Sequence, residues 1–162
     1  MNIGKKIVVT LATGSFMMAS LGAAQAFPSS NPLSISGDRG GYVIEYALRM
    51  LKLKQSGRKV EFRGSCDSAC TLYLALPRSQ VCVEPQSTFM FHMPYGAVGS
   101  GNRIAATYML NAYPGWVRSW INSKGGLSSQ PLVMNYAHAS KFLTTCGHSP
   151  ATVQARTAML GN

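Results

Sequence analysis

The sequence predicts a single α/β domain, and three observations support that prediction. The chain has 162 residues, of which 46% are hydrophobic and only 12% charged, which is typical of one globular domain. Segments of alternating polarity are interleaved with segments of helical periodicity, which is the βαβ pattern of a parallel sheet. Two connections are short and rich in glycine, and in such folds the loops after the strands gather at one edge.

The first 26 residues have the features of a signal peptide. The basic pair Lys5-Lys6 precedes an uncharged, mostly apolar run over 7–24, and Ala24-Gln25-Ala26 has the form of a signal-peptidase site. A retained membrane anchor is the alternative, but threonine, serine and glycine dilute the run, and no other segment approaches a membrane span. We therefore expect cleavage before Phe27, a domain over 27–162 and a periplasmic or secreted protein without a stable span.

The basic charge is then read in the light of export. The full chain has 15 Lys+Arg against 5 Asp+Glu, a net charge of +10, and loss of two leader lysines leaves +8. An exported protein does not meet cytoplasmic nucleic acid, so nucleic acid is excluded as a partner. An anionic component of the cell envelope, or no partner at all, is the expected explanation.

Export also determines how the four cysteines are interpreted. In an oxidising compartment, one or two disulfides are expected among Cys66, Cys70, Cys82 and Cys146, and three complete pairings are open. A zinc site is the competing interpretation, but the cysteines lack a second closely spaced pair and the histidines have no ligand-like spacing. We expect no metal and no cofactor.

The first half of the predicted domain alternates strands and helices. A strand over 33–36 leads into a sharp glycine loop over 37–41. A helix over 42–55 should bury an apolar face and end at Ser56-Gly57; that face comprises Ile44, Ala47, Leu48 and Leu51. A second strand over 59–63 and a second tight loop over 64–67 follow. The next segments are a helix over 68–76, ended by Pro77, and strands over 81–83 and 88–91.

The second half is predicted to be helical over 102–160, after a loose loop over 94–101. A long helical stretch over 103–123 is expected to kink or break at Pro114, and shorter helices are expected over 132–142 and 151–160. One stripe of the long stretch is apolar and aromatic, comprising Tyr113, Trp116, Val117, Trp120 and Ile121. Such a stripe is either core or a surface for self-association.

Three features could carry chemistry at the carboxyl edge of the sheet. The pair Gly40-Gly41 opens a helix and could donate N–H groups to an oxyanion, or could form only a tight turn. Ser68 begins a helix after a strand, so it is either a cap or a hydroxyl presented on a sharp bend. His92 ends a strand and is either structural or the general base of that hydroxyl.

These motifs together resemble those of a known family. The segments Gly37 to Tyr42, Gly64 to Thr71, Glu84-Pro85 and Phe91-His92 are similar to the proteolytic subunit of the Clp protease, in the ClpP/crotonase superfamily. They are more similar still to exported ClpP-like bacterial proteins with a Cys-x-Ser-Ala-Cys-Thr segment. The likeness covers about 33–96, with 28 residues from Gly40 to Ser68 and 24 from Ser68 to His92.

The resemblance implies a ClpP/crotonase-like spiral of stacked ββα and βαβ units. It also implies that Ser68 is the nucleophile, His92 the base, and the N–H groups of Gly40, Gly41 and Ala69 the oxyanion hole. Because superfamily members commonly form trimers or stacked rings, it implies a homo-oligomer.

One departure from the family concerns the third member of the triad. The Clp peptidase supplies an acid downstream of its histidine, but this chain has no Asp or Glu after Glu84. Asn122, Asn135 or a backbone carbonyl could orient His92 instead, or Lys124 or Lys141 could act as an alternative base. Three upstream acids, Asp38, Asp67 and Glu84, lie near the motifs, and Asp67 is expected to point away from His92.

Two functions follow from these residues. The first is an exported serine hydrolase, possibly a peptidase acting on peptide substrates without an ATPase partner. The second is a catalytically inactive ClpP-like module for binding or assembly in the periplasm.

Overall fold

The structure is a computed structural model that describes residues 31–147. The expected signal peptide and the expected helix over 151–160 lie outside the described residues. A six-stranded sheet runs in the order β5-β4-β2-β3-β6, and β1 pairs with the other side of β2. The strands are β1 Leu33–Asp38, β2 Val60–Asp67, β3 Val81–Val83, β4 Thr88–Phe91, β5 Leu132–Asn135 and β6 Thr144–Thr145. The predicted α/β class is confirmed.

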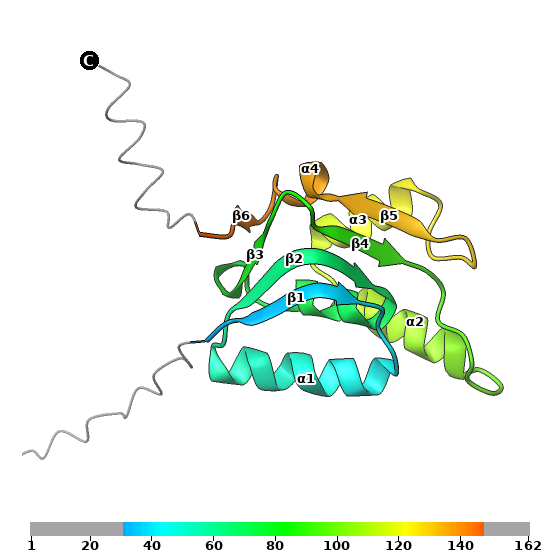
Figure 1. The fold of residues 1–162 in the computed structure, drawn as a ribbon. Coiled ribbons are helices and arrows are strands. Elements are labelled where there is room, and N and C mark those ends of the chain that lie inside the picture. Colours follow the sequence, from blue (N-terminus) through cyan, green and yellow to red (C-terminus); the bar gives the residue numbers. More distant parts are fainter. Residues whose placement is uncertain (1–30, 148–162) are drawn as a thin grey trace, which may run out of the picture.

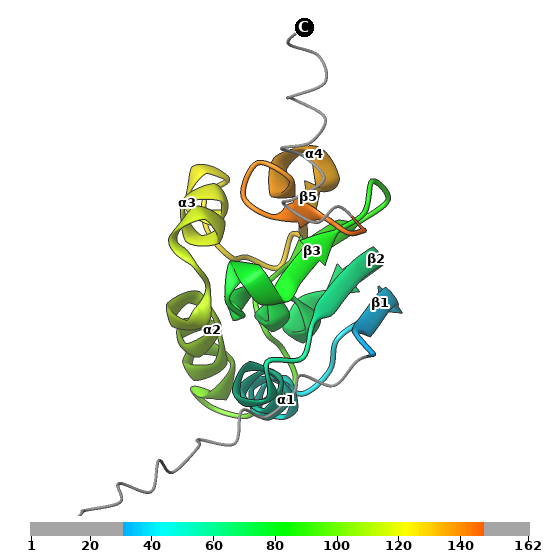
Figure 2. The ribbon, with the colours of Figure 1, turned by 90° about the vertical axis from the view of Figure 1, so that its left-hand side faces the viewer.

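Helices cover one side of this curled sheet (Figures 1 and 2). The α-helices are α1 Val43–Ser56, α2 Gly101–Ala112, α3 Gly115–Ser123 and α4 Tyr136–Ala139; the 3-10 helices are η1 Ser68–Ala75 and η2 Arg78–Gln80. Helix α1 ends at Gly57, whose φ of 66° is the expected left-handed cap. Within 31–147, no helix is both long enough and apolar enough to cross a bilayer.

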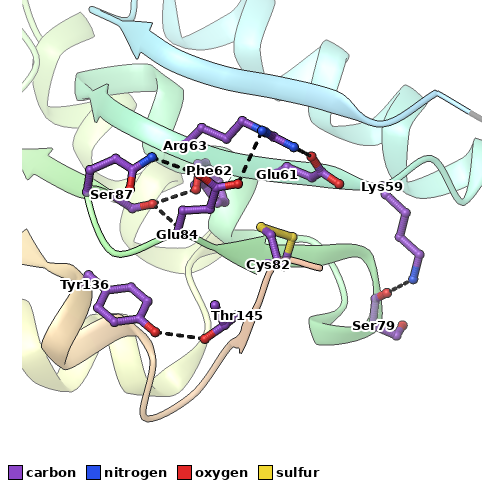
Figure 3. Close-up of a disulfide and its surroundings, with 12 residues drawn as sticks. Lys59, Glu61, Phe62, Arg63, Ser79, Cys82, Glu84, Ser87, Tyr136 and Thr145 are labelled. Carbon is purple, nitrogen blue, oxygen red and sulfur yellow. Dashed lines mark hydrogen bonds and ion pairs between the residues drawn. A yellow bond between two sulfur atoms is a disulfide. The ribbon is translucent and has the colours of Figure 1, made fainter. Parts of the chain in front are cut away.

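Strand β2 is the centre of the sheet because it pairs with three others. Its first half pairs with β3 and its second half with β4, so β3 and β4 lie end to end along one side of it. The connection between them turns at the Phe62 carbonyl, which accepts the Ser87 hydroxyl at 2.6 Å and the Glu84 N–H at 2.9 Å (Figure 3). Both predicted strands, 81–83 and 88–91, are confirmed.

The predicted tight loop over 64–67 is wrong, because β2 continues to Asp67. The final residues of β2 pair with β4 on one side and, through Ser65 and Cys66, with β1 on the other. Gly64 serves close packing and not a turn, since a Cβ there would lie 2.4 Å from the Ser36 carbonyl oxygen. The sequence alone does not distinguish a glycine that lets a neighbouring strand pack closely from a glycine that allows a bend.

The predicted buried face of α1 is also wrong, apart from Ala47. The face on the core comprises Tyr46, Ala47, Met50 and Leu53, whereas Ile44, Leu48 and Leu51 are exposed. Tyr46 determines the rotation of the helix, because its hydroxyl donates to Asp38 at 2.5 Å and its ring lies 5.6 Å from that of Tyr73.

The helical prediction for the C-terminal part is confirmed only in its first half. Helices α2 and α3 are separated at Pro114 as expected, and the aromatic stripe lies mainly in the core, with Tyr113, Trp116, Val117 and Ile121 buried. The stripe therefore offers no surface for self-association. The predicted helix over 132–142 is mostly wrong, since β5 pairs antiparallel with β4 and only α4 is helical.

We predict that Ser87→Ala lowers the free energy of unfolding by about 1–3 kcal/mol. The Ser87 hydroxyl is buried, donates to Phe62 and accepts from Glu84, so its loss leaves a buried carbonyl with one donor fewer. Urea unfolding of the oxidised protein measures the change. The neighbouring exposed change Gln86→Ala serves as the control, and equal stability of the two variants would contradict the prediction.

Candidate functional site

Three parallel strands end at the edge of the sheet that carries the predicted motifs. Strand β1 ends at Asp38 before the glycine turn, β2 ends at Asp67 before Ser68, and β4 ends at Phe91 before His92. The glycine turn, Ser68 and His92 therefore each follow a strand that ends at this edge, although the predicted loop over 64–67 is itself part of β2.

The glycine turn is fixed by Asp38. One carboxylate oxygen, Oδ1, accepts the Gly40 N–H at 2.8 Å and the Tyr46 hydroxyl at 2.5 Å. Burial and this bond raise the pKa of Tyr46, so the phenol stays protonated and continues to donate. Because the Gly40 N–H donates to Asp38, it is not available to donate to an oxyanion.

Ser68 has an unusual backbone conformation. Its φ is 56°, and no other non-glycine residue in the described part of the chain has a positive φ. A disulfide between Cys66 and Cys70 encloses this bend, and both half-cystines are fully buried. The Thr71 hydroxyl donates to the Ser68 carbonyl at 2.6 Å. The bend is therefore held by a covalent bond and a hydrogen bond.

Gly40 packs directly against the bend at Ser68. A Cβ on Gly40 would lie 2.5 Å from the Asp67 carbonyl oxygen, and 2.9 Å from both the Ala69 nitrogen and the Ser68 Cβ. Gly40 also has a φ of 79°, so both its conformation and its surroundings require glycine. The glycine turn and the serine bend thus meet backbone to backbone.

The orientation of His92 is set by its own main chain. Its Nδ1 lies 2.9 Å from the Met93 carbonyl oxygen, and a carbonyl can only accept, so Nδ1 carries the proton. The neutral ring then has its lone pair on Nε2, which is the tautomer that a general base needs. A backbone carbonyl, one of the alternatives that the sequence left open, makes this contact.

A shallow, mostly apolar pocket adjoins His92. It has a volume of about 460 Å³ and its lining includes Met90, His92, Met93, Tyr95 and Pro131. Ser68 is not among the residues that line it. His92 therefore lines a hollow that could receive an apolar group, whereas Ser68 does not.

Asp67 lies on the same side of the sheet as His92, contrary to expectation. It is in register with Met90, and Met90 and His92 line the same pocket. Burial raises the pKa of Asp67 and the nearby Asp38 carboxylate adds to this, whereas Arg39 and His92 lower it. Asp67 and His92 are therefore close enough to interact electrostatically.

The four other residues considered for this role lie elsewhere. Asn135 caps α4 by accepting the His138 N–H, while burial lowers the pKa of His138 and the positive charges of Lys141 and Lys124 lower it further. Asn122 is exposed near the end of α3. Among residues 31–147, no hydrogen bond joins any of these four side chains to His92.

The cysteines form two disulfides, Cys66–Cys70 and Cys82–Cys146. The expectation of one or two bridges is confirmed, and one of the three possible pairings is selected. The second bridge ties β3 to the chain just after β6 (Figure 3). In the described residues, no group of three His, Cys, Asp or Glu side chains could hold a metal ion.

Comparisons with known proteins add little to this site. No family model matches the chain, and no curated protein matches it. A solved structure of a ClpP1 mutant from Listeria monocytogenes is similar over 70% of this chain and 70% of its own, with 20% sequence identity and a TM-score of 0.42. The chemistry of the site therefore rests on its own residues.

We predict that Gly40→Ala destabilises the protein by about 3 kcal/mol or more, because it combines an unfavourable φ with overlap against the Asp67 carbonyl. Gly37→Ala is the matched control, since Gly37 has no positive φ and no atom within 4 Å of an added Cβ. Thermal unfolding compares the two. Equal midpoints would show that the contact between the two turns is not needed.

Proposed function

We propose that this protein is an exported ClpP-like serine hydrolase, with a peptidase as the most plausible form. The observation that supports it best is the Ser68 bend, strained and enclosed by a disulfide at the sheet edge where His92 also lies. A strained residue held by its surroundings is characteristic of functional sites. The two disulfides are compatible with an extracytoplasmic location.

In this proposal Ser68 and His92 act as nucleophile and base. His92 Nε2 accepts the Ser68 hydroxyl proton while the serine oxygen bonds to the substrate carbonyl carbon. The N–H groups of Ala69 and Gly41 stabilise the resulting oxyanion, with Gly40 contributing the close backbone approach instead of its own N–H. The proton then passes from His92 to the leaving group, and water releases the acyl group by the reverse sequence.

In this mechanism, two groups replace the downstream acid of the Clp peptidase, one for orientation of His92 and one for negative charge. The Met93 carbonyl fixes the tautomer of His92, and Asp67 supplies a negative charge near the histidine ring. Asp67 is upstream of Ser68, so this order differs from that of the Clp peptidase.

A catalytically inactive ClpP-like module is the second candidate. It is favoured by the engagement of the Gly40 N–H with Asp38 and by the absence of Ser68 from the lining of the pocket beside His92. Homo-oligomer formation is compatible with either candidate.

Labelling with a fluorophosphonate tests the proposed hydrolase. We expect an adduct on Ser68, located by mass spectrometry, and labelling at least 100-fold slower in His92→Ala because the general base is lost. Ser65→Ala, on the strand that precedes Ser68, should label like the native protein. A folded, oxidised protein that does not label would favour the inactive module.

A separate variant tests the proposed role of Asp67. We expect Asp67→Asn to label roughly tenfold more slowly, because positive charge develops on the His92 ring in the transition state and the Asp67 carboxylate is close enough to stabilise it. The rates of fluorophosphonate labelling of the two proteins, compared at one pH, measure the change. An unchanged rate would remove Asp67 from the mechanism.

A further inference from the structure

Helix α1 presents an apolar stripe to solvent. Ile44 is 69% exposed, Leu48 54% and Leu51 44%, and Tyr42, just before the helix, is 77% exposed. The three helical positions are spaced i, i+4 and i+7, so they lie along one side of the helix. We call Tyr42, Ile44, Leu48 and Leu51 the outer stripe.

The outer stripe is not needed for the fold. The opposite side of α1 supplies the core contacts through Tyr46, Ala47, Met50 and Leu53. Helix α1 lies at the periphery of the molecule, with β1 and β2 on one side of it and no described element on its outer side (Figures 1 and 2). Single exposed apolar residues are ordinary, but four along one peripheral helix indicate an interaction surface.

The segment of the chain that carries the outer stripe is basic. Between Glu45 and Glu61 the chain has no acidic residue and five basic ones: Arg49, Lys52, Lys54, Arg58 and Lys59. Glu45 is the one acidic residue of the helix, and it is paired, because its Oε2 lies 3.5 Å from Arg49 Nη2. Lys52 and Lys54 are exposed and flank the outer stripe in its C-terminal half.

We propose that α1 docks on an anionic lipid surface, with the outer stripe in the interface and the surrounding lysines against the headgroups. An exposed apolar stripe flanked by Lys and Arg is the pattern of helices that lie in the plane of a membrane interface. Charge complementarity favours this partner over a second copy of the chain, because a symmetric contact through α1 would bring like-charged lysines together.

The proposed surface is independent of the proposed hydrolase. Its residues are Tyr42 and three residues of α1, and none of them is the nucleophile, the base or an oxyanion donor. Since α1 begins directly after the glycine turn, however, docking would place the candidate site near the lipid surface.

Vesicle binding with lysine footprinting tests the proposal on the full chain. Vesicles of phosphatidylcholine alone are compared with vesicles that also contain phosphatidylglycerol, and lysine acetylation is mapped by mass spectrometry. We expect salt-sensitive binding to the anionic vesicles and protection of Lys52 and Lys54 but not of Lys124 and Lys141. Mapping by residue separates α1 from the apolar run over 7–24, which all variants share.

Matched variants separate the apolar and the electrostatic contributions. We expect anionic binding to weaken roughly tenfold in Lys52→Gln with Lys54→Gln, and also in Leu48→Gln with Leu51→Gln. The controls are Arg103→Gln with Lys124→Gln, and Val98→Gln with Ile104→Gln, which change the same charge or exposed apolar surface elsewhere.

Three results would overturn the proposal. The first is no binding to anionic vesicles, and the second is binding that the α1 variants and their controls weaken equally. The third is concentration-dependent dimerisation, measured by light scattering, that the Leu48 and Leu51 changes abolish while vesicle binding is unaffected. That result would make the outer stripe a contact between two copies of the chain.

Discussion

The contact between Gly40 and the Ser68 bend is the constraint on which the functional edge depends. Two turns after neighbouring parallel strands approach until their backbones touch, which is possible only because one of them lacks a Cβ. Asp38 holds the first turn and the Cys66–Cys70 disulfide holds the second. Each turn is therefore held by contacts of its own as well as by the other turn, and the left-handed Ser68 is held by both.

Much of the fold was predictable because local signals agreed with it. The strands at 81–83 and 88–91, the end of α1 at Gly57 and the break at Pro114 all follow from turn chemistry or alternation. The errors arose where tertiary contacts determine the structure. Gly64 resembles a turn residue until β1 is placed beside it, and Leu132 to Asn135 resembles a helix until β4 offers an antiparallel edge.

The exposed face of α1 is a further case in which tertiary contacts override a local sequence pattern. Ile44, Leu48 and Leu51 form a regular apolar stripe, and periodicity alone assigns that stripe to the core. The structure buries a second stripe instead, because Tyr46 is anchored to Asp38 and Met50 and Leu53 follow it inward. Helix α1 has two apolar stripes and buries one of them in its own domain, so the other is left exposed.

The residues of the candidate site could be proposed from the sequence, but the contacts that they make could not. Order and spacing identify Gly40, Ser68 and His92, whereas the partner of His92 is a backbone carbonyl that no sequence motif reveals. A carbonyl can fix a tautomer but carries no full negative charge. In the proposed hydrolase, the charge that a triad acid would supply comes from Asp67, whose carboxylate interacts electrostatically with His92. Orientation and charge stabilisation, which one acid provides in a Ser-His-Asp triad, are thus assigned in our proposal to separate groups.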